Sequence, residues 1–382
     1  LSLTNNSGSL ISTAKAGVSA IRLNGVRTGV ITNSGTITGA GTTGEGGTAI
    51  AIDNSANTTQ TTINLESGST TNGSLKLGTG AVSEDIVNFN GGVLNGDIIA
   101  GAADKGIVNV TASTVNNGLL GETNGLSAFN MTSGTFTLNN DVKALTSTIS
   151  SGAGLNIGTT GKTISGNVSH NGLLTISQSK MLTISGDYSQ STNGVFQVGV
   201  SDDTNYGSLA VTGTATLPSN AKIDVNVTDP NFVFSTAYTN GMANIISAGT
   251  LTSDGTFSVT DNSLLFNFAA VKDGNTVDLT LSSAAPAVLT STVNTGTTVA
   301  AGAAAVIDNI IVSNPTGAIA TNFISLTTEQ EVANAVESTL PGVSGGAAQA
   351  TNIATNAVTG VIASRQDLTR GLSSGDDMMT DR

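Results

Sequence analysis

The stretch from Ser185 to Leu217 reads SGDYSQSTNGVFQVGVSDDTNYGSLAVTGTATL and marks a change in the character of the sequence. Before it, short aliphatic strands alternate with Gly and Asn. From Ser185 to about Ser283, all three Tyr and six of the ten Phe appear. Larger side chains suit a module that closes the open end of stacked β layers. We therefore predict that residues 185–283 form a β cap on the structure that precedes them.

The sequence from Leu1 to Ile184 repeats itself imperfectly. Asn-x-Gly turns occur as NSGSL (residues 6–10) and NSGTI (residues 33–37), and related elements recur at spacings of roughly 20 to 30 residues, the range typical of solenoids. Gly and Asn tolerate the left-handed backbone that corners need. No Pro occurs before Pro218, so every strand keeps its N–H groups. Residues 1–184 are predicted to form stacked β coils. The alternative is a β-sandwich, which typically has longer strands and aromatic anchors.

Composition excludes several classes of function. Of the 382 residues only 10% are charged and 3% are aromatic, while 38% are hydrophobic, which argues against a disordered chain. The net charge of −13 and the lack of a basic run disfavour nucleic-acid binding. Cysteine is absent, which excludes disulfides, thiolate metal sites and cysteine nucleophiles.

The stretch that begins at Ser185 resembles the junction near the end of autotransporter passengers, the exported domains of type V secretion. In that family a right-handed parallel β-helix comes first, an autochaperone cap contains the junction, and a linker leads to an outer-membrane β-barrel. The resemblance therefore implies an all-β chain with a short, mostly helical linker. The matching residues are Gly186, Asp187, Tyr188, Gln190, Gly194, Tyr206, Leu209, Val211, Gly213, Ala215 and Leu217.

This resemblance divides the chain into three expected parts: β-helix repeats (1–184), an autochaperone-like cap (185–283) and a helical or flexible linker (284–382). Within the cap, Asp273-Gly274 between two alternating runs predicts a β-hairpin. The chain opens without a leader peptide and shows no barrel-like strands after Leu281. We interpret it as an internal piece of a longer precursor whose barrel is absent.

Helical patterns follow Pro286. An Ala-rich segment at residues 299–312 is predicted to be a helix that ends before Pro315. Thr327 and Thr328 each satisfy the spacing of a capping box before EVANAVESTL. A further helix is expected at residues 347–372, with Ile353, Ala357, Val361 and Ser364 near one face.

Candidate catalytic residues are few. His170 is the only histidine, so it cannot build a zinc site alone, and we expect it in a turn between coils. Asp97, Asp141 and Asp187 occupy similar places in successive repeat-like units. They could form a carboxylate site on a polysaccharide-cleaving β-helix, but a ladder of turn residues is favoured.

Two acidic pairs, Asp202-Asp203 and Asp376-Asp377, are candidates for calcium binding. Neither matches an EF-hand loop or the Gly-rich calcium nonapeptide, so solvated loops are the favoured interpretation. The sequence therefore predicts no catalytic residue, no cofactor-binding residue, no metal site and no enzymatic activity.

A long, polar and weakly charged solenoid suits adhesion through many weak contacts. We predict a passenger on the surface of a Gram-negative bacterium, or secreted from it, that acts in virulence as an adhesin or cell–cell aggregation factor. Its expected partners are a host or environmental receptor, a polysaccharide or a second copy, together with the barrel of its own precursor. The alternatives are a polysaccharide-degrading enzyme and a stalk that presents a missing domain.

Overall fold

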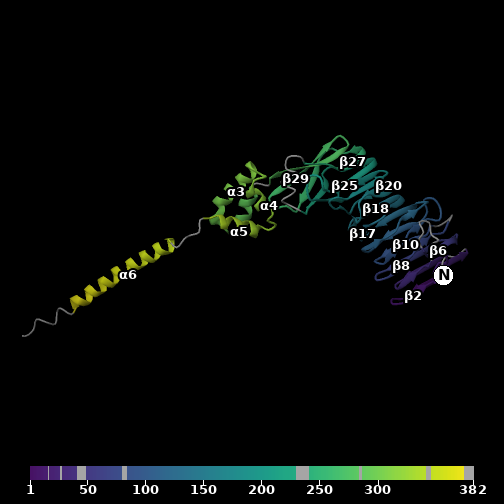
Figure 1. Cartoon of the computed structure of the whole chain (residues 1–382), viewed down its shortest axis with the longest axis horizontal. Coiled ribbons are helices and arrows are strands. Elements are labelled where there is room, and N and C mark those ends of the chain that lie inside the picture. The colour runs from purple at the N-terminus through teal and green to yellow at the C-terminus, as the bar shows by residue number, and fades with distance from the viewer. Residues whose placement is uncertain are drawn as a thin grey trace, which may run out of the picture.

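The computed structural model describes residues 1–15, 17–25, 28–40, 49–79, 84–228, 241–283, 286–340 and 346–373. The chain is mostly β, with two long sheets of chiefly parallel strands and a short helical segment at its C-terminal end. Figure 1 shows the strands stacked along one axis, the helices α2 to α5 beyond the last strands, and α6 apart from both. A mostly β chain with a helical end is therefore confirmed, and the finer expectation of a right-handed β-helix stays a prediction.

The smaller sheet has eleven strands, which pair in the order of the chain. Each strand pairs in parallel with the strand two or three places along the chain. We call this sheet the second face. Its strands are β2 (Leu10–Ser12), β5 (Thr36–Thr38), β8 (Thr70–Asn72), β11 (Val93–Asn95), β14 (Thr114–Asn116), β17 (Gly134–Leu138), β19 (Ala153–Ile157), β21 (Leu173–Ile176), β24 (Val195–Val200), β26 (Ala221–Val227) and β28 (Phe257–Asp261).

The larger sheet has nineteen strands and supplies two further faces. The strands before each second-face strand form the first face: β1 (Ser2–Asn5), β4 (Gly29–Asn33), β7 (Thr61–Glu66), β10 (Ile86–Asn90), β13 (Ile107–Val110), β16 (Leu126–Met131) and β23 (Tyr188–Gln190). Those after it form the third face: β3 (Ile21–Gly25), β6 (Ile50–Asn57), β9 (Ser74–Lys76), β12 (Ile98–Ile99), β15 (Leu120–Glu122) and β22 (Met181–Ser185).

Four longer strands of this sheet carry the chain from the third face of one layer to the first face of the next. They are β18 (Val142–Ile149), β20 (Lys162–His170), β25 (Ser208–Thr216) and β27 (Met242–Thr252). One passage through the three faces is called a coil below. Stacked coils of this kind are consistent with a β-solenoid, the architecture that the repeats predict.

The core consists of columns of inward side chains, one residue per coil. One column on the first face runs through Leu65, Phe89, Val110, Met131, Ile149, His170 and Gln190. All seven are buried, because period-two alternation sends every second residue of a strand inward. The rings of Phe129 and Phe136 meet edge to face, with centroids 5.1 Å apart, and join the first face to the second.

The predicted hairpin is confirmed. Strands β29 (Phe266–Asp273) and β30 (Thr276–Ser283) pair antiparallel across Asp273-Gly274, and Gly274 has a φ of +55°. Strand β30 also pairs antiparallel with β27, which ends the parallel order of the third face. The parallel pairing itself continues without a break across residues 184 and 185 into β25 and β26. The boundary of the cap at residue 185 stays a prediction.

The helical end contains α2 (Ala287–Asn294), the 3₁₀ turn η2 (Thr298–Ala300), α3 (Ala301–Ser313), α4 (Ala318–Ile324), α5 (Glu329–Thr339) and α6 (Gly346–Ser373). The helices expected at residues 299–312 and 347–372 are confirmed, whereas α2 and α4 were not predicted. Of the two possible capping boxes, the structure uses Thr328 with Glu331. Helices α2 to α5 share a core that includes Val288, Ile311 and Val332. In the described part of the chain, no helix is both long and apolar enough to cross a membrane.

Candidate binding face

A ladder of asparagine side chains follows the outside of the first face. Asn64, Asn88, Asn109 and Asn130 occupy the same position in four successive coils. Each Nδ2 donates to the Oδ1 of the previous residue, over 2.8, 3.0 and 3.1 Å. The ladder forms because parallel, in-register strands place equivalent residues about 4.8 Å apart. An amide that both donates and accepts suits this repeated spacing.

A second ladder lies on the second face. The Nδ2 of Asn95 donates to Asn72, that of Asn117 to Asn95, and that of Asn139 to Asn117, over 2.8, 2.8 and 3.2 Å. Asn72 in turn donates to Thr38 over 3.2 Å. Asn95 and Asn117 are exposed, so this ladder is open to a partner. We refer to these two sets of four residues as the asparagine ladders.

The ladders present a regular, uncharged array of hydrogen-bonding groups. Contacts within a ladder use one N–H and one oxygen lone pair of an interior amide. The other N–H and the other lone pair of that amide point away from the ladder bonds. The sequence contains the signal for this array, since Asn recurs in IVNFN, IVNV and AFNM at intervals of 21 residues. Sequence analysis missed it because the strand register that aligns these residues was unknown.

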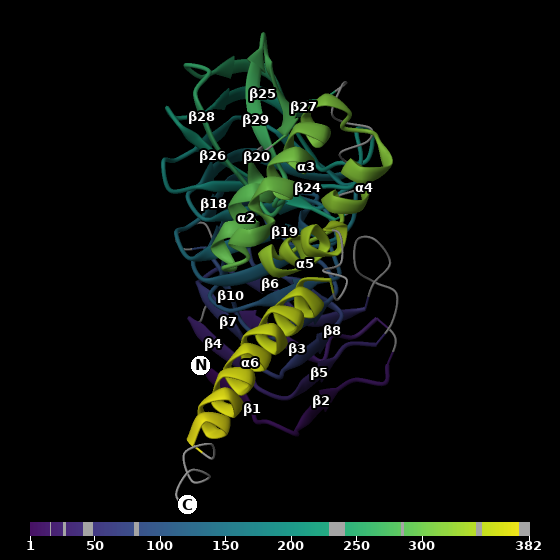
Figure 2. The same cartoon turned by 90° about the vertical axis from the view of Figure 1, so that its left-hand side faces the viewer.

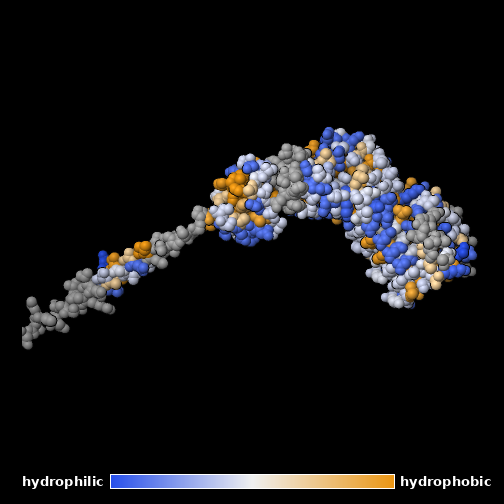
Figure 3. Space-filling view, viewed as in Figure 1, coloured by the Kyte–Doolittle hydropathy of each residue, from blue (hydrophilic) through white to orange (hydrophobic). Residues whose placement is uncertain are grey.

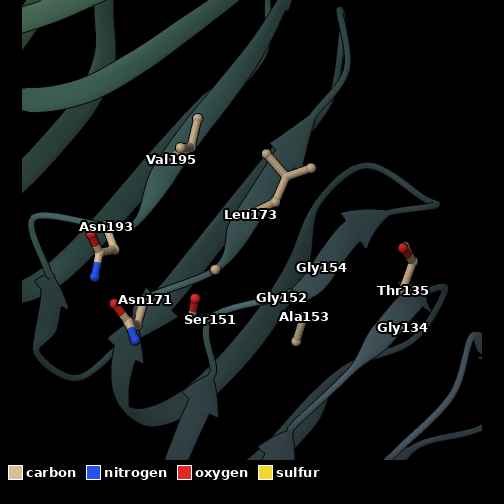
Figure 4. A pocket seen from close by; sticks show the side chains of 11 residues that line it. Gly134, Thr135, Ser151, Gly152, Ala153, Gly154, Asn171, Leu173, Asn193 and Val195 are labelled. Atoms are coloured by element: carbon tan, nitrogen blue, oxygen red, sulfur yellow. The ribbon is translucent and has the colours of Figure 1, made fainter.

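A hollow of about 360 Å³ lies against the second face, where β17, β19, β21 and β24 begin. Figure 4 shows Asn171 and Asn193 beside Ser151 at the corner, with Leu173 and Val195 on the strands. The remaining lining residues are Gly134, Thr135, Gly152, Ala153, Gly154 and Gly172. The hollow combines amide and hydroxyl groups with aliphatic surface, and no charged or aromatic side chain lines it. These groups can form weak hydrogen bonds with a polar partner.

The acidic residues singled out in the sequence hold the coils together. Asp97 is buried, and its Oδ1 accepts the N–H of Leu119 over 2.8 Å. Asp141 and Asp187 are exposed and accept the N–H groups of Thr163 and Thr214, each over 2.8 Å. Every one of these bonds joins one coil to the next. Each carboxylate thus bonds backbone beside a strand start, as expected of a turn residue, but the prediction that the three occupy similar places in successive units is wrong, because Asp187 lies at a different corner.

These three carboxylates do not share a site. Asp97 and Asp141 both precede third-face strands, but two coils apart, so their backbones are separated by about 10 Å. Asp187 precedes β23 on the first face, at a different corner. Over the residues that the structure describes, no group of three or more His, Asp or Glu side chains is placed to hold a metal ion.

His170 lies inside the stack. The prediction that it occupies a turn is wrong: it is the last residue of β20, and it points into the core, where Ile149 and Gln190 are its neighbours in the column. Its Nδ1 is 2.6 Å from Tyr188 Oη and its Nε2 is 3.1 Å from Gly172 O. Burial lowers the pKa of His170 to about 4, although the backbone of Gly172 and Val195 raises it in part. Both ring nitrogens are therefore occupied by hydrogen bonds that stabilise the fold.

Asp202 closes its own loop. Burial alone raises its pKa, but hydrogen bonds from Thr204 and Asn205 outweigh that effect and hold the pKa at about 2. Its Oδ1 accepts the N–H groups of both residues over 2.7 Å, and its Oδ2 accepts from Asn205 Nδ2 over 2.7 Å. Both oxygens of this carboxylate therefore accept hydrogen bonds from residues of its own loop. The pair Asp376-Asp377 lies outside the described residues.

Comparison with known proteins does not assign the chain to a family. No protein-family model matches the sequence, and no curated protein aligns with it at a significant level.

Proposed function

We propose that this chain is the C-terminal part of an autotransporter passenger, a right-handed parallel β-helix exported to the surface of a Gram-negative bacterium. The stacked parallel strands support this proposal, since crossovers between parallel strands of one sheet are almost always right-handed. The antiparallel hairpin over the last coil has the place of a cap. On this proposal, the helical end leads toward the barrel of the same precursor.

The residues that carry the family resemblance make coil-to-coil contacts, which supports the same proposal. Asp187 bonds the next coil at Thr214, and the Nε2 of Gln190 donates to the carbonyl groups of Gly194 and Lys222. Tyr188 is fully buried against His170. A motif with this role belongs to the stacking of a solenoid rather than to a catalytic site.

The proposed activity of the passenger is adhesion, and the asparagine ladders are the observation that carries it. They offer repeated, uncharged amide donors and acceptors along an extended surface, so that a partner gains many weak hydrogen bonds in register. A carbohydrate chain, a polar receptor surface or a second copy has matching groups. No observation favours the polysaccharide-cleaving alternative, because Asp97, Asp141 and Asp187 are each bonded to backbone.

The test uses bacteria that display the intact precursor, with settling of the cells and binding to host cells as the two readouts. The variant Asn95→Arg with Asn117→Arg places two long charged side chains on the exposed ladder. The matched control is Asn24→Arg, an exposed asparagine on third-face strand β3. Surface display is measured for each variant by antibody against the passenger.

We expect the ladder variant to lose most of its clumping or host binding, while Asn24→Arg keeps both. Loss of clumping alone would identify self-association, and loss of host binding alone would identify an adhesin. If the ladder variant is displayed normally and keeps both activities, the exposed ladder on the second face is not the binding face and the proposal is wrong for it.

A further inference from the structure

Helices α3, α4 and α5 leave an apolar groove between them. It encloses about 580 Å³, and none of the described residues that line it is charged. Val306 and Ile319 on its walls are 57% and 45% exposed, which is high for aliphatic residues. Figure 3 shows hydrophobic surface on this part of the molecule, beside α3. Its lining residues are Ala303, Val306, Ile307, Ile310, Ile319, Asn322, Phe323, Leu326, Ala335, Ser338 and Thr339.

Helix α6 presents a second apolar surface, and none of the other described elements covers it. Ile353 and Val361 are 68% and 58% exposed, and Val358 and Ile362 are similarly open. At 100° per residue these side chains, with Ala357, fall on one half of the helix, while Asn356 and Thr359 fall on the other. From Gly346 to Ser364 the helix carries no charged residue. Figure 2 shows α6 as a single extended rod beyond α5.

The composition of α6 indicates that it needs a partner. Thr, Asn, Val and Ile are weak helix formers, and Gly360 lies in the middle of the helix. From Gly346 to Ser364, where no residue is charged, no ion pair one turn apart stabilises the helix. Most helical stability in proteins comes from packing of an apolar face. The exposed apolar half of α6 is the face available for that packing.

The groove is placed to receive this helix. Ser338 and Thr339, in the last turn of α5, line it, so the chain leaves α5 at the rim of the groove. The six steps from Leu340 to Gly346 span at most about 20 Å. A tether this short gives α6 a high effective concentration at the groove. Both surfaces are apolar and uncharged, so their contact buries no unpaired charge.

We propose that the groove between α3, α4 and α5 is a docking site for α6 of the same chain. Ile353, Ala357 and Val361, one turn apart, enter the groove as anchors, which is the common way an amphipathic helix occupies an apolar groove. Gly360 has open space around it and lets the backbone of α6 approach closely. Docking covers the exposed Val306 and Ile319.

The absence of cysteine allows a direct test in the full 382-residue chain. Val306→Cys is combined with Val361→Cys, and a short thiol cross-linker is added at low protein concentration. The matched control combines Val306→Cys with Asn356→Cys, which lies about 140° away around the helix. Products are sized by gel and mapped by mass spectrometry. We expect a monomeric cross-link in the first variant at a yield at least about fivefold above the control, because only the apolar half faces the groove.

Equal yields in the two variants would overturn the docking of α6. A product that is mainly dimeric would also overturn it, in favour of a second copy as the occupant. Amide exchange gives an independent measurement. Val361→Asp should speed exchange in α6 by at least about tenfold, because burying a charge opposes docking. Asn356→Asp should leave the exchange unchanged, and protection of α2 to α5 reports that the groove is intact. Equal α6 exchange in both variants would count against the proposal.

Discussion

The Nδ1 of His170 lies 2.6 Å from the phenolic oxygen of Tyr188 inside the stacked sheets. The other ring nitrogen faces the carbonyl oxygen of Gly172, which only accepts, so Nε2 carries the proton and donates. Nδ1 therefore accepts from the Tyr188 hydroxyl. The two residues come from adjacent coils, since Val168 pairs with Tyr188. One hydrogen bond thus joins two coils through the core, and it requires a neutral imidazole.

This pair predicts a loss of stability in mild acid. The pKa of His170 is about 4 in the folded chain and about 6.5 when the ring is free. Below pH 6.5 the His170 imidazole binds a proton in the unfolded chain but stays neutral in the folded chain. The free energy of unfolding therefore falls as the pH drops from 6.5 to 4. This shift in the pKa of His170 lowers the free energy of unfolding by roughly 3 kcal/mol at pH 4. Urea unfolding at pH 7 and at pH 4 measures this loss.

A matched variant isolates this effect. His170→Gln places in the column the residue type that occupies the next coil at Gln190, and Gln does not titrate. The variant should lose most of the difference in unfolding free energy between pH 6.5 and 4. Asp202, with its pKa held at about 2, titrates below that window. An undiminished pH dependence in His170→Gln would assign the acid sensitivity to other groups.

Removing the hydroxyl tests the same bond from the other side. Tyr188→Phe leaves Nδ1 of His170 buried without its donor, at a cost of about 1–3 kcal/mol in the free energy of unfolding at pH 7. His170→Leu with Tyr188→Phe removes both polar groups. The double variant should lose less stability than the sum of the two single variants, and additive losses would show that the two groups are not coupled.

The elements that sequence analysis predicted correctly are those with local signals. Asp273-Gly274 fixes a hairpin because two residues decide the turn, and Thr328 with Glu331 fixes a helix start within four residues. Short-range repetition of Gly, Asn and aliphatic residues predicts coils in the same way. None of these features needs knowledge of residues far along the chain.

The features that were missed depend on register. Coils differ in length, so the sequence does not show that Ile149, His170 and Gln190 share an inward column. His170 was placed in a turn because a polar residue beside Asn171-Gly172 is typical of one. The asparagine ladders and the groove depend on the same long-range alignment, which only the folded chain supplies.

Substitution of Gly166 tests how closely the backbones of successive coils pack at a corner. Its φ is +107°, and an added Cβ would run into the carbonyl oxygen of Ala144 in the preceding coil. Gly152 also has a positive φ, +83°, but has no atom within 4 Å of an added Cβ. Gly152→Ala therefore measures the cost of the backbone conformation alone, about 1–2 kcal/mol. Gly166→Ala should cost at least about 2 kcal/mol more. Equal urea midpoints would mean that the corner relaxes freely.

Asp308 shows how one buried carboxylate starts a helix that lacks a local cap. Helix α2 follows Pro286, which offers no side-chain cap. Asp308, on α3, instead accepts the N–H groups of Val288 and Leu289 over 3.0 and 2.9 Å, and its negative charge faces the positive end of the helix. Asp308→Ala should cost about 1–3 kcal/mol and speed amide exchange at Val288 and Leu289. Asp308→Asn keeps one acceptor oxygen, so its stability and its exchange rates should lie between those of the unchanged chain and those of Asp308→Ala. Unchanged exchange at both amides in Asp308→Ala would show that α2 is held by its apolar contacts alone.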